Sequence, residues 1–166
     1  MPRARITWVR PETIHLTVKF LGDIEGGRAE ALREKVRAAI DLHPAIDIPL
    51  ERIGAFPRPQ APRAFWIGPL ADWEHSDDAK RVGEMVKAID DTCAALGVAR
   101  DEHPWRPHLT LARVRDRERE VGRALMAGVV FDRPISAGVL RISEIALMKS
   151  DLEPDGPRYS TLWTIP

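Results

Sequence analysis

Alternating hydrophobic and polar residues near the start of the chain predict its first strand. Residues 14–21 read IHLTVKFL, and successive side chains of a strand point to opposite faces. One face would carry Leu16, Val18 and Phe20, and the other His15, Thr17 and Lys19. We therefore expect a half-buried strand that ends at Gly22. The same reasoning predicts strands over residues 46–53, 64–68, 108–114, 139–148 and 158–165.

Apolar residues spaced three or four positions apart predict helices between these strands. The expected helices cover residues 28–42, about 77–96 and about 117–126. Ser76 is suited to cap the second helix at its start, and Gly97 to end it. Cys93, the only cysteine, lies on the apolar side of that helix. We expect it to be a buried small hydrophobe, and no intramolecular disulfide can form.

The order of the elements contains an imperfect repeat. His15-Leu16-Thr17 and His108-Leu109-Thr110 each follow a turn with Arg and Pro, and each precedes a helix and then a strand. Two similar halves with the same motif predict one domain of two lobes, about residues 1–63 and 64–166, with strand exchange between them. The lobes would be related by a pseudo-twofold axis, and the motifs would face each other across a cleft.

Each motif places an imidazole and a hydroxyl on one strand face, because residues i and i+2 point the same way. Two histidines on opposite sides of a phosphorus atom can divide the proton transfers: one deprotonates water, and the other protonates the leaving oxygen. The Thr17 and Thr110 hydroxyls can hydrogen-bond the nonbridging oxygens, and this chemistry needs no metal. A single His-x-Thr usually marks a surface histidine, so the duplication is what indicates catalysis.

Composition narrows the class of partner. The 166 residues are 44% hydrophobic, and 25 Lys and Arg balance 25 Asp and Glu. A nonspecific duplex binder would more usually carry a basic excess, although a local pocket for one phosphate is compatible with zero net charge. No apolar run is as long as a membrane helix, and no secretory signal is evident. We expect a cytoplasmic enzyme or binding protein with a substantial core.

Two segments resemble the paired signatures of the 2H phosphoesterase superfamily. They are residues 8–22, WVRPETIHLTVKFLG, and residues 106–114, RPHLTLARV. More narrowly, they are similar to the bacterial and archaeal RNA 2′,3′-cyclic phosphodiesterases, long called 2′-5′ RNA ligases. The Gly54-Ala55-Phe56-Pro57 stretch and the Arg158-Tyr159 segment are also similar to that family.

The resemblance implies a bilobal α+β fold, with two antiparallel sheets flanking a central cleft and helices outside. It implies hydrolysis of RNA 2′,3′-cyclic phosphate ends, or of nucleoside 2′,3′-cyclic phosphates, to a 2′-phosphate without cofactor or metal. His15 would donate a proton to the leaving oxygen, and His108 would accept one from water. Thr17 and Thr110 would bind the phosphate. Arg113 would add charge there if the strand ends or bulges before it, because strict alternation places Arg113 opposite His108.

Other side chains have weaker indications. Lys19 lies on the histidine face and is either a further phosphate contact or a solvated lysine. Trp105, close to the second motif, is the best candidate for stacking on a base, with core or rim packing as the alternative. The remaining histidines lack ligand-like spacing for a metal; they are His43, His75 and His103.

One departure from the family concerns the start of the chain. Family members usually carry a strand and a helix before the first motif, whereas only 14 residues precede His15. Either the sequence starts inside a longer natural chain, or this variant lacks the β-α unit. A sheet edge left uncovered would favour self-association, because its backbone groups can pair with another chain.

Two alternatives to the hydrolase remain open. The same site could join RNA ends through a 2′-5′ linkage by the reverse chemistry, although water would normally outcompete a scarce 5′-hydroxyl. The chain could instead be a module that binds RNA ends and has lost its activity.

Overall fold

The computed structural model describes residues 4–131, 133–153 and 156–166 and divides into two compact units. Unit 1 contains the chain up to Thr17, Ile48–Glu74 and Arg106–Leu140; unit 2 contains Val18–Asp47, His75–Trp105 and Arg141–Pro166. These units do not coincide with lobes divided near residue 63. Strands β3 (Arg52–Phe56) and β4 (Ala64–Gly68), on either side of that position, form one antiparallel pair.

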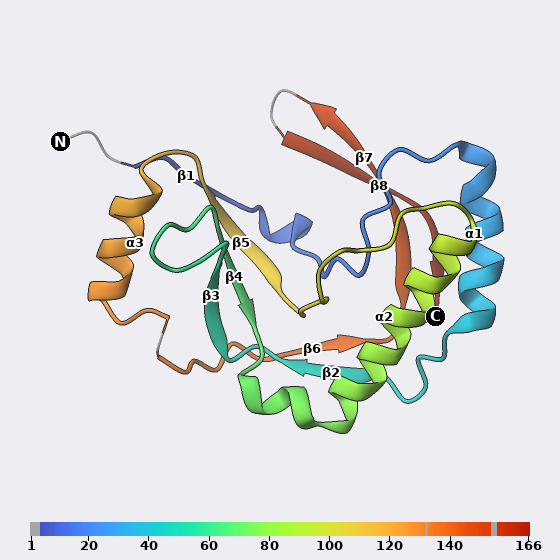
Figure 1. Ribbon diagram of the computed structural model, residues 1–166, viewed down its shortest axis with the longest axis horizontal. Coiled ribbons are helices and arrows are strands. Elements are labelled where there is room, and N and C mark those ends of the chain that lie inside the picture. Colours follow the sequence, from blue (N-terminus) through green and yellow to red (C-terminus); the bar gives the residue numbers. More distant parts are fainter. Residues whose placement is uncertain (1–3, 132, 154–155) are drawn as a thin grey trace. The chain divides into compact units, whose positions relative to one another are not determined.

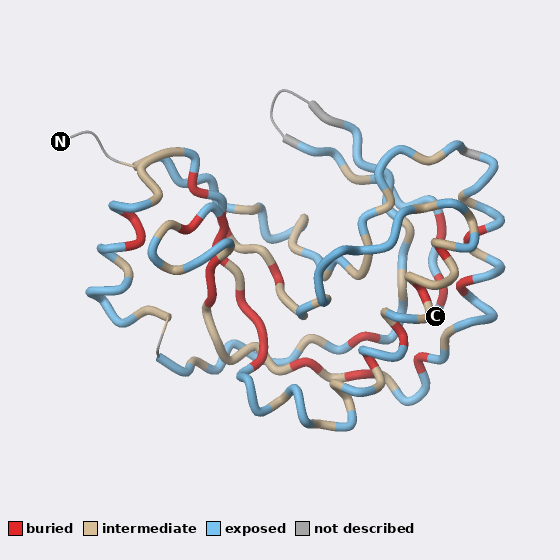
Figure 2. Tube along the Cα trace, in the orientation of Figure 1, coloured by how far each residue is buried: buried red, intermediate tan, exposed pale blue. Residues whose placement is uncertain are grey.

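Unit 1 is built on a four-stranded antiparallel sheet in the order β1-β5-β4-β3 (Figure 1). Its other strands are β1 (Ile6–Trp8) and β5 (Leu109–Val114). One face is buried against helix α3 (Glu118–Ala127), and Figure 2 shows buried residues along β3, β4 and β5. That core contains Ala55, Phe65, Ala112, Val114 and Val121. The opposite face of the sheet carries the Phe56 and Trp66 rings, whose centroids are 5.5 Å apart.

Unit 2 contains two helices and a β-hairpin, β7 (Ile145–Glu153) and β8 (Gly156–Ile165). Helix α1 (Gly26–Ala39) packs on both α2 (Asp77–Ala95) and β8. As predicted, the Ser76 hydroxyl caps α2 by accepting a 3.0 Å hydrogen bond from the Ala79 N–H, and Gly97 follows its end with a φ of +83°. Cys93 is buried as predicted, and this burial raises the pKa of its thiol.

Short elements complete the fold. Strands β2 (Ile46–Pro49) and β6 (Val139–Ile142) form a two-stranded sheet. Two 3-10 helices, η1 (Pro11–Thr13) and η2 (Ala71–His75), lie in connections. The predicted α+β class with antiparallel sheets is confirmed. No helix in the described residues has the length and apolar character needed to cross a membrane.

Three predicted strands differ from the observed ones. Residues 46–53 and 139–148 are each interrupted, giving separate strands that pair with different partners. Within residues 14–21 only Leu16 forms a β-bridge, and Phe20, predicted to face the core, is 79% exposed. The chain passes into unit 2 after Thr17, where Lys19 binds carboxylates, so the alternation of this segment does not correspond to a sheet beyond Leu16.

Candidate active site

The two His-x-Thr motifs lie side by side in unit 1. Leu16 and Leu109 are antiparallel bridge partners, so the same register, continued by one residue each way, sets His15 opposite Thr110 and Thr17 opposite His108. All four polar side chains then share the face opposite to the two leucines. The internal repeat predicted the motifs in separate lobes, whereas both belong to unit 1.

This register arranges the four polar residues as the corners of a square. Directly opposite residues have Cβ atoms about 4.5–5.5 Å apart, and diagonal neighbours are about 7–8 Å apart. Each side of the square joins a histidine to a threonine, so His15 and His108 occupy one diagonal, and Thr17 and Thr110 the other. A tetrahedral group at the centre would meet imidazoles on opposite sides and hydroxyls on the remaining two.

Both imidazoles are held by the same local hydrogen bond. Nδ1 of His15 lies 2.8 Å from the Thr13 carbonyl oxygen, and Nδ1 of His108 lies 2.8 Å from the Arg106 carbonyl oxygen. A carbonyl oxygen only accepts, so Nδ1 must carry the proton in each ring. This leaves Nε2 to accept a proton when the ring is neutral, or to donate one when it is cationic.

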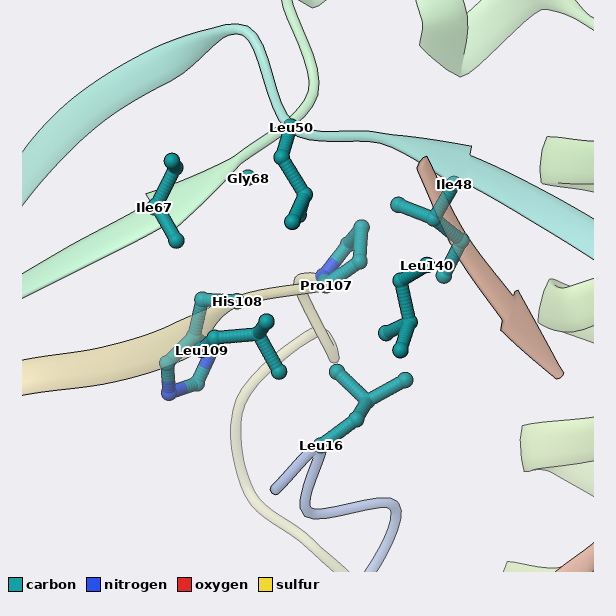
Figure 3. A pocket seen from close by; sticks show the side chains of 9 residues that line it. All are labelled: Leu16, Ile48, Leu50, Ile67, Gly68, Pro107, His108, Leu109 and Leu140. Carbon is teal, nitrogen blue, oxygen red and sulfur yellow. The ribbon is translucent and has the colours of Figure 1, made fainter. Parts of the chain in front are cut away.

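The leucines of the motifs contribute to an apolar hollow behind the histidine face. Figure 3 shows Leu16, Leu109 and Leu140 gathered there, with the His108 ring turned away from them. Other lining residues are Ile48, Leu50, Ile67, Gly68 and Pro107. Apart from His108 the lining side chains are apolar, so this hollow offers nothing to bind a phosphate; it anchors the backbone that carries the motifs.

Aromatic rings surround His108 but were not identified from the sequence. The Phe56 ring meets His108 edge-on at 4.9 Å between centroids, and the Trp66 ring lies 6.3 Å away at 62°. Both are T-shaped contacts, a favoured aromatic geometry. Alternation along β3 predicts from the sequence that Phe56 and Gly54 share a face. It does not predict that this is the face of the His-x-Thr motifs, which follows from the pairing of β3 with β4 and of β4 with β5.

Gly54 makes room for this arrangement, which gives a testable prediction. A Cβ atom on Gly54 would lie 2.0 Å from Cζ2 of Trp66. We expect Gly54→Ala to displace the indole and to lower the free energy of unfolding by about 1–3 kcal/mol, as overpacking does. Urea titration would measure this loss.

Gly83→Ala is the matched control, because nothing lies within 4 Å of a Cβ at that position within α2. The control should be neutral or stabilising by up to about 1 kcal/mol, since alanine is the better helix former. Equal stability of the two variants would contradict a space requirement at Gly54.

A β-bulge brings Arg113 to the face of the motifs. Trp66 is opposite Thr110, but the preceding Phe65 is opposite Ala112, so Leu111 is the extra residue of the bulge. Arg113 is opposite Ala64, which shares a face of β4 with Trp66. Arg113 could face the phosphate only if the strand ended or bulged before it, and the bulge at Leu111 does this. The Arg113 side chain is therefore on the same face as Thr110.

Lys19 has other partners than a phosphate. Its side chain is only 3% exposed, and its ammonium lies 2.6 Å from Oδ1 of Asp90 and 3.2 Å from Oδ1 of Asp101. It also donates a 2.9 Å hydrogen bond to the Ala99 carbonyl. Burial alone would lower the pKa of Lys19, but the two carboxylates raise it. These contacts argue against the phosphate role considered for Lys19.

The remaining candidates lie in unit 2. Trp105 is half-buried, and base stacking by it stays a prediction. His43, His75 and His103 also belong to unit 2. In the described part of the chain, no three His, Cys, Asp or Glu side chains are grouped so as to hold a metal ion.

An α+β fold with duplicated His-x-Thr segments paired on one sheet defines the two-histidine phosphoesterase class. A family model described as the 2′-5′ RNA ligase superfamily matches residues 5–154. The chain belongs to this superfamily, which confirms the resemblance inferred from the motifs.

Curated relatives cover most of the chain. An RNA 2′,3′-cyclic phosphodiesterase of Archaeoglobus fulgidus is 32% identical over 155 residues, spanning 93% of this chain and 80% of the relative. One of Methanothermobacter thermautotrophicus is 28% identical over 159 residues, spanning 96% and 81%.

Solved structures share the fold at lower identity. Escherichia coli LigT in complex with 3′-AMP has a TM-score of 0.71 and 19% identity, covering 95% of this chain and 79% of that one. A Thermus thermophilus protein has a TM-score of 0.66 and 22% identity, covering 96% and 80%.

Proposed function

We propose that the chain hydrolyses RNA 2′,3′-cyclic phosphate ends to 2′-phosphates by acid–base catalysis with His15 and His108. The observation that carries the proposal is the antiparallel bridge between Leu16 and Leu109, because its register sets two imidazoles and two hydroxyls around one point. The names of the curated relatives support the same reaction.

In this mechanism a cyclic phosphate lies between the diagonal histidines. Neutral His108 takes a proton from water through Nε2, and the water oxygen forms a bond to phosphorus. The bond from phosphorus to O3′ breaks, and cationic His15 gives its Nε2 proton to O3′. The products are a 2′-phosphate and a 3′-hydroxyl. Positions on opposite sides of phosphorus suit the entering and leaving oxygens, which are in line in such displacements.

The threonines and Arg113 would stabilise the negative charge of the phosphate. Thr17 and Thr110 occupy the other diagonal, from which hydroxyls can donate to the two nonbridging oxygens. Arg113 shares the face of Thr110 through the bulge, and a guanidinium is well suited to phosphate oxygens. We also propose base stacking by Trp105 as a lesser contact.

Incubation with a nucleoside 2′,3′-cyclic phosphate in the presence of EDTA tests the proposal. Release of the 2′-phosphate without metal is the expected result, whereas activity that needs a divalent metal would contradict the mechanism. Binding of the cyclic phosphate without turnover would favour a binding module. Adding an RNA with a 5′-hydroxyl end examines ligation; we expect hydrolysis to dominate, because water is in large excess.

The threonine variants provide a second prediction. Thr17→Val and Thr110→Val keep the side-chain shape but remove a hydroxyl, and each should lower kcat by about 10²-fold, as the loss of one charge-stabilising donor does in other enzymes. Steady-state kinetics on the nucleoside cyclic phosphate would measure the loss. Thr92→Val serves as a control, because the Thr92 hydroxyl donates a hydrogen bond to the Ala88 carbonyl within α2. Unchanged kcat in both motif variants would contradict the phosphate contacts.

A further inference from the structure

We propose that Arg52 binds the phosphodiester preceding the terminal nucleotide, so that the site favours an oligonucleotide end over a nucleoside 2′,3′-cyclic phosphate. This inference rests on the proposed function and adds a substrate class to it. Arg52 belongs to neither motif and begins strand β3.

The sheet places Arg52 in line with His108. Arg52 is opposite Gly68 on β4. Ile67 is opposite Leu109 on β5, so Gly68 and His108 are the next pair in that register. Arg52 and His108 therefore flank Gly68 on the same face, about two strand spacings or roughly 9.5 Å apart in backbone. Gly68 has no side chain of its own, and the Trp66 ring occupies the space over it: Cζ3 of Trp66 would lie 3.3 Å from a Cβ atom at Gly68.

The Trp66 ring connects the two side chains. The Arg52 guanidinium carbon lies 5.3 Å from the centre of the Trp66 ring, within the range of a cation–π contact. The same ring system is 6.3 Å from the His108 imidazole. Arg52 Nε is buried and has no hydrogen-bond partner in the described chain, so the stack on Trp66 is what holds the guanidinium.

The charge of Arg52 is not matched within the described residues. No Asp or Glu carboxylate among them lies within 4.0 Å of its guanidinium. The two terminal nitrogens of a guanidinium form a planar fork that suits phosphate oxygens. Because the guanidinium already covers one face of Trp66, this part of the site is suited to an anion and not to a stacked base.

The position of this charge indicates which anion it binds. The cyclic phosphate is accounted for by the square of histidines and threonines, and Arg52 lies one strand beyond Gly68, on the far side from Thr17. The next anionic group of an RNA end is the phosphodiester on the 5′ side of its last nucleotide. A nucleoside 2′,3′-cyclic phosphate lacks that group. Comparing it with an oligonucleotide end therefore distinguishes a contact of Arg52 with the phosphodiester from the contacts of the motifs with the cyclic phosphate.

The test compares kcat/KM for a dinucleotide ending in a 2′,3′-cyclic phosphate with that for the corresponding nucleoside cyclic phosphate. We expect the dinucleotide-to-nucleoside ratio to fall about tenfold in Arg52→Gln, the loss typical of one charged hydrogen bond. Arg52→Lys should recover part of the ratio. The control is Arg123→Gln, which removes an equal charge from an exposed position on α3 and should leave the ratio unchanged.

The outcomes separate this inference from the proposed function. An unchanged ratio in Arg52→Gln, or equal losses on both substrates, would overturn the phosphodiester contact while leaving the hydrolase intact. If the wild-type protein hydrolysed neither substrate, the proposed function would fail. Calorimetry would then measure the affinities for the dinucleotide 2′-phosphate and for the nucleoside 2′-phosphate. The ratio of these two affinities, in wild type and in Arg52→Gln, would test the contact at Arg52.

Discussion

His15→Asn and His108→Asn are each expected to lower kcat on a nucleoside 2′,3′-cyclic phosphate by about 10²–10⁴-fold, the usual contribution of a general acid or base. The asparagine amide can keep the hydrogen bond that Nδ1 makes to the carbonyl two residues earlier, but it has no counterpart of Nε2. The loss should therefore reflect proton transfer, and steady-state kinetics would measure it.

Two comparisons make this test specific. The double variant should lose little more than the worse single variant, because residues that act as a unit are not additive. His103→Asn, an exposed histidine of unit 2, should keep full activity. Retention of more than a tenth of wild-type kcat in either motif variant would contradict acid–base catalysis by the pair.

The separate roles of the histidines can be distinguished by changing the leaving atom. A cyclic substrate with sulfur in place of O3′ needs little help from a proton donor, since a thiolate leaves readily. The proposed donor variant, His15→Asn, should recover on this substrate, while His108→Asn should not. The opposite pattern would reverse the two assignments.

Removal of the carboxylate beside Lys19 is expected to have the largest effect on stability. Asp90→Asn leaves the ammonium of a side chain that is 3% exposed with Asp101 and the Ala99 carbonyl as its remaining partners among the described residues. We expect the free energy of unfolding at pH 7 to fall by about 2 kcal/mol, less than the roughly 3–5 kcal/mol for an ion pair broken completely. Urea unfolding followed by circular dichroism would measure it.

The pH dependence of this loss of stability follows from the directions in which the pKa values of Asp90 and Lys19 are shifted. The hydrogen bond from Lys19 lowers the pKa of Asp90, so its contribution is complete above the unfolded carboxyl pKa of about 3.9 and disappears as pH falls through the folded value. The Lys19 pKa is raised, so that contribution persists below about pH 10.4 and disappears as pH rises through the folded value. The difference between wild type and Asp90→Asn should narrow below about pH 4.

A double-mutant cycle with Lys19→Met separates this pair from its surroundings. The double variant should lose less free energy of unfolding than the sum of the losses in Asp90→Asn and Lys19→Met, because methionine leaves no buried ammonium without its partner. Lys87→Met is the matched control, since that lysine pairs with Asp91 at the surface and should change stability little. A coupling energy of zero, or a gap that does not change with pH, would contradict the role of the ion pair.

Local features of the chain were predictable because local chemistry fixes them. The Ser76 cap, the Gly97 terminus and the burial of Cys93 depend on helical periodicity and on a few neighbouring residues. The fold class and family were predictable because the His-x-Thr repeat is specific and occurs twice. Lys19 was ambiguous for the opposite reason: its partners Asp90 and Asp101 are distant in sequence.

The histidine site shows where sequence reasoning ends. The sequence alone determined the four polar residues of the motifs and the face that each pair shares, because alternation along a strand is a local property. Only the tertiary structure decided that Leu16 pairs with Leu109, that a bulge turns Arg113 toward Thr110, and that Arg52 is in line with His108. Those are matters of register between strands, which depends on backbone hydrogen bonds and packing between segments far apart in the chain.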